Sequence, residues 1–112
     1  MSVASAKAAR GEALFAANPA RGEAGLAGFR LRPSFAALVA AEADLGPLFA
    51  LVERAADGRL TLAETVGLLW HCCDPRPEGL TQEGFGEAVC AQGLAAITPV
   101  LRTILQQILA GA

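Results

Sequence analysis

Residues 61–77 read TLAETVGLLWHCCDPRP and contain the start, the body and the end of one predicted helix. Thr61 and Glu64 have the spacing of a capping box, in which the threonine oxygen and the glutamate carboxylate each accept a hydrogen bond from a backbone amide. Pro75 and Pro77 end the helix, because proline lacks an amide hydrogen and its ring clashes with the turn before it. The side chains that we expect to form the buried stripe of this helix are Leu62, Val66, Leu69, Trp70 and Cys73.

Two more helices are predicted before this stretch. The first runs from Ser34 to Gly46 and the second from Pro47 to Gly58, since serine caps a helix, proline suits its first turn and glycine ends it. Spacing at i, i+3, i+4, i+7 and i+10 predicts the inward side chains of the first helix, Phe35, Leu38, Val39, Glu42 and Leu45. Those of the second are Leu48, Leu51, Val52 and Ala55.

Two helices are also predicted after it. Thr81 caps one helix, which carries Phe85 and Val89 toward the core, and Thr98-Pro99 supplies the start of the last helix. The last helix has a continuous apolar stripe formed by Val100, Leu101, Ile104, Leu105, Ile108 and Leu109. The polar side chains that oppose this stripe are Arg102, Thr103, Gln106 and Gln107.

A short β-hairpin is predicted ahead of the helices, over residues 22–32. Its second half, Phe29-Arg30-Leu31-Arg32, alternates strictly between apolar and charged side chains, which is the period of a half-buried strand. We therefore expect the phenylalanine and the leucine to face inward and the two arginines to face water. Two strands alone are only marginally stable, so the hairpin should lie on the helices.

These elements predict a mainly α, small single domain of four to five short helices with a short N-terminal β-hairpin. A chain of 112 residues, 54% of them hydrophobic, is long enough for one core without disulfide bridges. Residues 1–20 are rich in alanine and end near Asn18-Pro19, so we expect a flexible N-terminal arm there. The helical domain then covers residues 21–112.

Charge and composition narrow the possible partners. Nine basic and eleven acidic side chains are scattered along the chain and form no basic stripe, so we expect no nucleic-acid binding. The apolar stretches are much shorter than the roughly 18–20 residues that cross a bilayer, so we expect no membrane association. The start of the chain does not have the pattern of an export signal, and this predicts a cytoplasmic protein with reduced thiols.

A metal or thiol site is an alternative that the cysteines raise. His71, Cys72 and Cys73 are adjacent and Cys90 follows later, but consecutive helical residues point about 100° apart and cannot converge on one tetrahedral ion. We expect instead that Cys73 packs behind Trp70 as a small apolar side chain and that His71 lies on the exposed side of its helix. The alternative remains a small site built from the histidine and the three cysteines.

The remaining patterns give no cofactor or catalytic site. Glu53 to Glu64 resembles a calcium loop faintly, but Ala55 stands where such a loop needs a side-chain oxygen. The chain has no glycine-rich phosphate loop, and Glu42 and Asp44 lie two apart and point to different sides of a helix. We therefore expect no catalytic residue, no cofactor and no bound metal, and a protein that is not an enzyme.

An ordered set of short elements carries a resemblance to a known family over Arg21 to Ala110. These elements are RGEA (21–24), FRLRPSFAAL (29–38), AEADLG (41–46), LFALVER (48–54), GRLTLAE (58–64), LLWHC (68–72), LT (80–81) and GLAA (93–96). In this order they resemble the small proteins encoded in bacterial gene transfer agent clusters and related tailed phages, which are classed as tail assembly chaperones.

The resemblance implies a non-enzymatic protein of tail morphogenesis. Such chaperones are thought to hold the tape-measure protein soluble while the tail tube polymerises around it, so the implied partners are the tape-measure protein and other tail proteins, with a possible homo-oligomer. Members of the same family are also described as tail tube components, which leaves open a structural subunit retained in the particle. The resemblance identifies no partner-binding residues, although the apolar stripe of the last helix could dock on its own core or on a partner helix.

Overall fold

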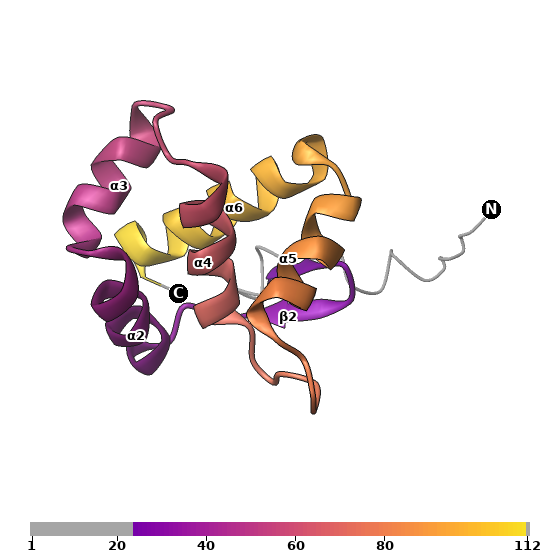
Figure 1. Ribbon diagram of the computed structural model, residues 1–112. Coiled ribbons are helices and arrows are strands. Elements are labelled where there is room, and N and C mark those ends of the chain that lie inside the picture. Colours follow the sequence, from indigo (N-terminus) through magenta and orange to yellow (C-terminus); the bar gives the residue numbers. More distant parts are fainter. Residues whose placement is uncertain (1–23, 112) are drawn as a thin grey trace.

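The helix that follows the capping box lies in the middle of the fold. The computed structural model describes residues 24–111, so the arm predicted over residues 1–20 lies outside the described part of the chain. Figure 1 shows the order of the elements. They are strands β1 (Ala24–Leu26) and β2 (Phe29–Leu31) and helices α2 (Phe35–Leu45), α3 (Leu48–Ala56), α4 (Leu62–Cys72), α5 (Gln82–Ala91) and α6 (Leu94–Ala110).

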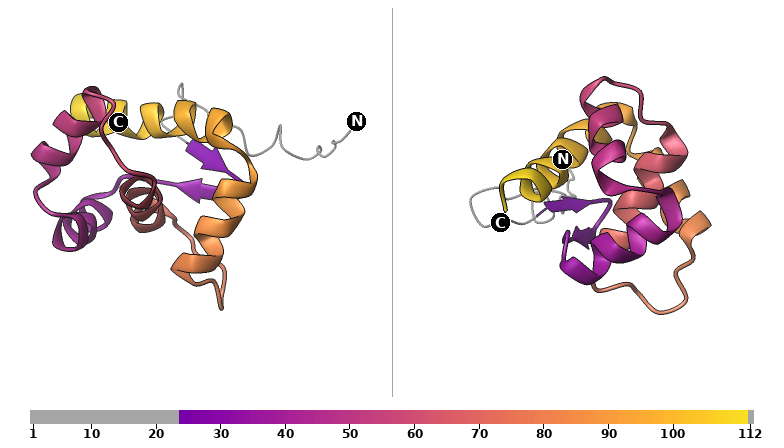
Figure 2. Two further views of the ribbon diagram at one scale, coloured as in Figure 1. Left: turned by 45° about the horizontal axis from the view of Figure 1, so that its top comes forward. Right: turned by 90° about the vertical axis from the view of Figure 1, so that its left-hand side faces the viewer.

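Helix α4 packs against α2 on one side and against α5 on the other. Helix α3 follows α2 after a sharp bend, and α6 runs over the hairpin, where it contacts β1 (Figure 2). The predicted mainly α domain with a short N-terminal hairpin is therefore confirmed, with five helices among the described residues.

The hairpin has the predicted orientation. Strands β1 and β2 are antiparallel, and the turn between them places Ala27 and Gly28 at φ of 55° and 84°. Positive φ at both turn positions is the geometry of the two-residue turns that match the twist of a hairpin. Leu31 is fully buried, Phe29 is half-buried, and Arg30 is exposed, as the alternation predicts.

The hairpin is joined to the end of α4 by backbone hydrogen bonds. Arg32 N–H donates to the carbonyl of Cys72 at 2.7 Å, and Asp74 N–H donates to the carbonyl of Arg30 at 3.0 Å. Leu31 and Cys73 form the antiparallel bridge between these two bonds. The chain after α4 therefore pairs with β2 as a very short third strand, which the sequence patterns do not reveal.

Phe85 lies at the centre of the core. Its ring contacts Phe29 at 5.0 Å and Trp70 at 5.6 Å between centroids, both in tilted arrangements that aromatic pairs favour. Arg76, in the loop after α4, places its guanidinium 4.0 Å from the Trp70 ring centroid and donates to the Trp70 carbonyl at 3.0 Å. The other fully buried large side chains are Leu31, Leu51, Leu68, Leu69, Ile104 and Val89.

The predicted inward face of α2 is correct for Leu45, which packs against the core, but wrong for Phe35, Val39 and Glu42, which are exposed. Phe35 is 85% exposed and Val39 is 50% exposed, whereas the buried residues of the helix are Ala37 and Ala41. The reason is close packing against α4, where a β-carbon added at Gly67 would lie only 3.2 Å from Leu45 Cδ2. Small residues allow this approach, and Phe35 and Val39 consequently lie on the outer side of α2.

The predicted start of the last helix is also wrong. Helix α6 begins at Leu94 after Gly93, and Pro99 is its sixth residue rather than its first. The proline removes only the hydrogen bond to the carbonyl of Ala95, which belongs to an exposed residue and can be solvated. Leu62 at the start of α4 and Leu109 near the end of α6 were expected to be buried and are exposed.

Gln107 lies on the buried side of α6, not on the polar side predicted for it. It follows Val100 by seven residues and Ile104 by three, which places all three on one helical face. Both polar atoms of its carboxamide are inaccessible to solvent, and neither finds a hydrogen-bond partner among the described residues.

Two phenylalanine substitutions test which side chains are buried in the core and which are exposed. Phe85→Ala should lower the free energy of unfolding by about 3–5 kcal/mol, because it leaves a cavity in the core. Phe35→Ala, the matched control on α2, should change it by less than about 0.5 kcal/mol. Urea denaturation followed by circular dichroism measures both values, and a large loss for the Phe35 variant would contradict the observed orientation of α2.

Candidate interaction surface

The outer side of α2 is apolar as well as its inner side. The helix opens with seven consecutive apolar residues, FAALVAA over residues 35–41, so no side of its first two turns is polar. Only the side with Ala37 and Ala41 is buried in the domain. An apolar helix side left in water is a feature of surfaces that bind other molecules.

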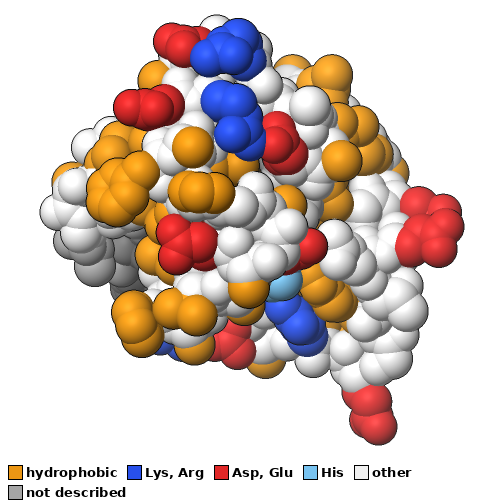
Figure 3. Space-filling model, turned by 60° about the vertical axis from the view of Figure 1, so that its left-hand side comes forward, with side chains coloured by type: hydrophobic (Ala, Val, Ile, Leu, Met, Phe, Trp, Pro, Cys, Tyr) orange, Lys and Arg blue, Asp and Glu red, His pale blue; other side chains and the backbone are white. Residues whose placement is uncertain are grey.

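Helix α3 continues this surface. Phe49, in its first turn, is 86% exposed, while Leu51 faces the core and is buried. The two helices are joined by a hydrogen bond in which Leu48 N–H donates to Glu42 Oε2 at 3.0 Å, so the glutamate caps the start of α3. We call the exposed set Phe35, Val39, Glu42, Phe49 and Glu53 the α2–α3 face. Figure 3 looks at this side of the molecule and shows hydrophobic side chains interspersed with carboxylates.

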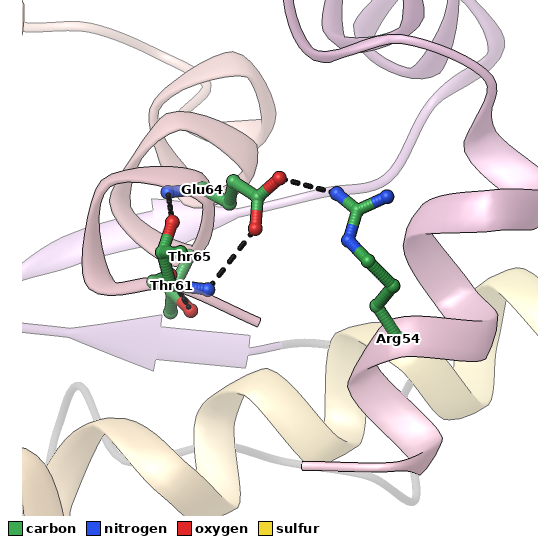
Figure 4. A network of polar contacts seen from close by, with 4 residues as sticks. All are labelled: Arg54, Thr61, Glu64 and Thr65. Carbon is green, nitrogen blue, oxygen red and sulfur yellow. Dashed lines mark hydrogen bonds and ion pairs between the residues drawn. The ribbon is translucent and has the colours of Figure 1, made fainter. Parts of the chain in front are cut away.

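A polar network fixes α3 against the start of α4 (Figure 4). The predicted capping box is confirmed: Glu64 N–H donates to Thr61 Oγ1 at 3.1 Å, and Thr61 N–H donates to Glu64 Oε1 at 3.0 Å. The other carboxylate oxygen of Glu64 accepts a hydrogen bond from the guanidinium of Arg54, on α3. Thr65 donates its hydroxyl hydrogen back to the Thr61 carbonyl at 3.0 Å.

This network lowers the pKa of Glu64. The main cause is the hydrogen bond from the Thr61 amide, with further contributions from the charge of Arg54 and from the side chains of both residues; partial burial opposes them. The charged carboxylate is thus favoured by folding. Its stabilising effect is present above the ordinary pKa of 4.5 and is lost as the pH falls through the lowered value.

The pH dependence of protein stability tests the role of the Glu64 carboxylate in this network. Glu64→Gln should be less stable than the unmodified protein at neutral pH, because it removes the charge paired with Arg54. The difference should begin to shrink as the pH falls below about 4.5, where the unfolded chain takes up the proton, and should be lost once the pH is below the lowered pKa of the native carboxylate. Glu87→Gln, at an exposed position on α5, is the control and should show no such convergence. Thermal denaturation across the pH range measures this, and a constant difference would contradict the role of the charge.

His71 does not lie on the exposed side of α4 as the sequence suggests. Only 15% of its side chain is exposed, and its Nε2 lies 3.0 Å from Asp44 Oδ2 on α2. The histidine is covered because α2 packs along the same side of α4. The pair therefore adds a polar link between the two helices that are in closest contact.

The cysteines do not form one site. Cys72 and Cys73 are buried and Cys90 is exposed, and no group of three His, Cys, Asp or Glu side chains in the described part of the chain is placed to hold a metal ion. Burial, with a smaller contribution from Cys73, raises the pKa of the Cys72 thiol to about 12. Burial also raises the pKa of Cys73, as does Asp74, while Arg76 opposes the shift.

Thiol labelling tests this difference in reactivity. In the native protein at about pH 8, one of the three thiols should react quickly with a chromogenic disulfide reagent, because the thiolate is the reactive form and only Cys90 is accessible. Cys90→Ser should abolish the fast phase, and unfolding in denaturant should release the other two thiols. Fast reaction of two or three thiols in the folded protein would contradict the burial of Cys72 and Cys73.

The residues of the faint calcium loop belong to three different local structures. Glu53 lies within α3, Asp57 caps the end of that helix, and Glu64 is held by the capping box of α4. Gly58 follows with a φ of 71°, which glycine adopts without strain. The residue types at these positions are therefore accounted for by the end of α3 and the start of α4.

Two other observations concern exposed apolar surface. Leu94 and Leu109 are exposed near opposite ends of α6. Among residues 24–111 no single helix is both long and apolar enough to cross a membrane; only the consecutive pairs α2 with α3 and α5 with α6 reach that length together, across bends of 82° and 116°.

Comparison with known proteins assigns the family. The family model described as phage tail tube protein, GTA-gp10, matches residues 23–111, which is most of the chain. The chain belongs to this family of phage tail proteins. The resemblance to the tail proteins of gene transfer agents is thereby confirmed. No curated protein and no solved structure gives a significant match.

The α2–α3 face of this tail protein was not predicted from the sequence, because the helical spacing places Phe35 and Val39 among the core residues. A signal was nevertheless present, since the uninterrupted apolar run over residues 35–41 gives α2 more apolar surface than one core-facing side can use. Phe49 carried a weaker signal, because it lies outside the predicted inward stripe of Leu48, Leu51, Val52 and Ala55. In that stripe Leu51 is buried and Leu48 packs against the core, while Val52 and Ala55 are half-buried.

Proposed function

We propose that this tail protein is a chaperone of tail assembly that binds the tape-measure protein in the cytoplasm and catalyses no reaction. The observation that carries the proposal is the α2–α3 face, on which two phenylalanine side chains are more than four-fifths exposed. Covering one such side chain on binding gains about 1.5–3 kcal/mol, which favours a partner that shields both.

The geometry suits a long helical client. An amphipathic helix is bound by laying its apolar side against apolar side chains of a partner, and both α2 and α3 offer such side chains on their outer surfaces. Several copies of a small domain can bind successive segments of one long client, and their combined effect keeps its apolar surface out of water. Membership of a phage tail family supports a tail protein as the client.

The second candidate function is a structural subunit that stays in the tail tube. The description of the family as tail tube protein favours it. The apolar α2–α3 face would then contact a neighbouring subunit instead of a client that is later released. The two functions differ in whether the protein is present in mature particles.

Co-expression with the tape-measure protein from the same gene cluster tests the proposed function. The expected result is a soluble complex that co-elutes on size-exclusion chromatography, with several copies of this protein per client. Mass spectrometry of purified particles should then find the protein absent or far below the copy number of the tube subunit. Failure to form the complex, together with tube-like copy numbers in particles, would favour the structural subunit.

A further inference from the structure

Carboxylates are built into the apolar α2–α3 face in a regular way. On α2, Phe35, Val39 and Glu42 follow the spacing i, i+4 and i+7, so they form one stripe along the outer side of the helix. On α3, Phe49 and Glu53 follow the spacing i and i+4. Each exposed apolar stripe therefore ends in an exposed carboxylate.

These two carboxylates form no ion pair among the described residues. The only Lys or Arg in α2 and α3 is Arg54, and its guanidinium is paired with Glu64. The third acid of the two helices, Asp44, is paired with His71. Neither Glu42 nor Glu53 takes part in an ion pair within residues 24–111, so the face has a net negative charge available to a partner.

We propose that the α2–α3 face binds an amphipathic helix whose apolar side chains cover Phe35, Val39 and Phe49 and whose flanking positions carry Lys or Arg. The inference rests on the proposed function, because it specifies the chemistry of the client segment. Basic side chains beside the apolar stripe of the client would pair with Glu42 and Glu53 at the edge of the contact. Complementary charge of this kind sets the orientation of a partner and its rate of association.

A second copy of the chain is a poorer occupant of this face. In a symmetric dimer the same surface meets itself, so the carboxylates of one copy would approach those of the other. Like charges placed together oppose binding. A partner helix with basic flanks avoids this repulsion and still covers the phenylalanines.

Two synthetic helical peptides of about 18 residues, roughly five turns, serve as probes. Both carry Leu at the positions of one helical stripe, and they differ only in having Lys or Glu at the flanking positions. Fluorescence anisotropy with the full-length protein should give tighter binding of the Lys peptide by at least about ten-fold, with an affinity that falls as salt is added. Equal binding of the two peptides would overturn the proposal.

Substitutions in the full chain locate the site. Phe35→Ala combined with Phe49→Ala should weaken binding of the Lys peptide by at least about ten-fold without changing the melting temperature, because both side chains are exposed. Glu53→Lys should weaken it by at least about three-fold at low salt, and Glu87→Lys, on α5 at the other side of the molecule, should leave it unchanged (Figure 1). Equal effects of the two charge reversals, or no effect of the double variant, would overturn the proposal.

Other occupants of the face give different outcomes. A dimer in light scattering that Phe35→Ala and Phe49→Ala dissociate would assign the face to a second copy and overturn the proposal. Tighter peptide binding by about ten-fold in a full-length Leu14→Ala, Phe15→Ala variant would assign it to the segment before residue 24, and would also overturn it.

Capture of the tape-measure protein separates this inference from the proposed function. If the unmodified protein and the Phe35, Phe49 double variant capture the tape-measure protein equally well, the chaperone function stands and the α2–α3 face is the wrong site. If the Lys peptide binds at this face but the tape-measure protein is not captured, the site stands and the proposed client is wrong. Capture by the unmodified protein that the double variant loses supports both.

Discussion

The close contact between α2 and α4 is the constraint on which the rest of the structure depends. Ala37 and Ala41 are the buried residues of α2, and Leu45, one turn further on, lies against Gly67 of α4. A large side chain at the two alanines would force the helices apart, because the packed interior has little room for added volume. With the small residues committed to the contact, Phe35 and Val39 have to face water.

The same contact links the interior of the domain to its exposed surface. The bend after α2 brings Phe49 of α3 to the outside, and Glu42 fixes the bend by capping α3 at Leu48. Arg54 and the capping box of α4 then hold α3 in place from its other end. The face that we propose for client binding is thus supported by rigid elements, so binding does not require the helices to be reordered.

A tail-assembly chaperone has to bind its client firmly enough to keep it soluble and weakly enough to release it when the tube forms. In the proposed function, a small face with two aromatic side chains per domain would meet both needs, because each contact is modest and many copies would act together. In the proposed complex, the carboxylates Glu42 and Glu53 would add selectivity for a helix with basic flanks without adding much affinity.

The sequence alone determined the features that depend on neighbouring residues. Ser34, Thr61 and Thr81 accept hydrogen bonds from the first turns of α2, α4 and α5, as expected of N-cap residues, because a cap interacts only with residues two or three positions away. The alternation in Phe29-Arg30-Leu31 correctly predicted which side of the hairpin is buried, and an ordered set of short elements correctly indicated the family.

Only the tertiary structure decided which side of an apolar helix is buried. The run over residues 35–41 fits equally well with Phe35 or with Ala37 facing inward, and the choice depends on how closely α4 approaches. The pairing of His71 with Asp44 and of the hairpin with the end of α4 joins residues far apart in the chain, so no local pattern predicts it. These contacts form because folding brings distant surfaces together, and the same process leaves the α2–α3 face uncovered in the described domain.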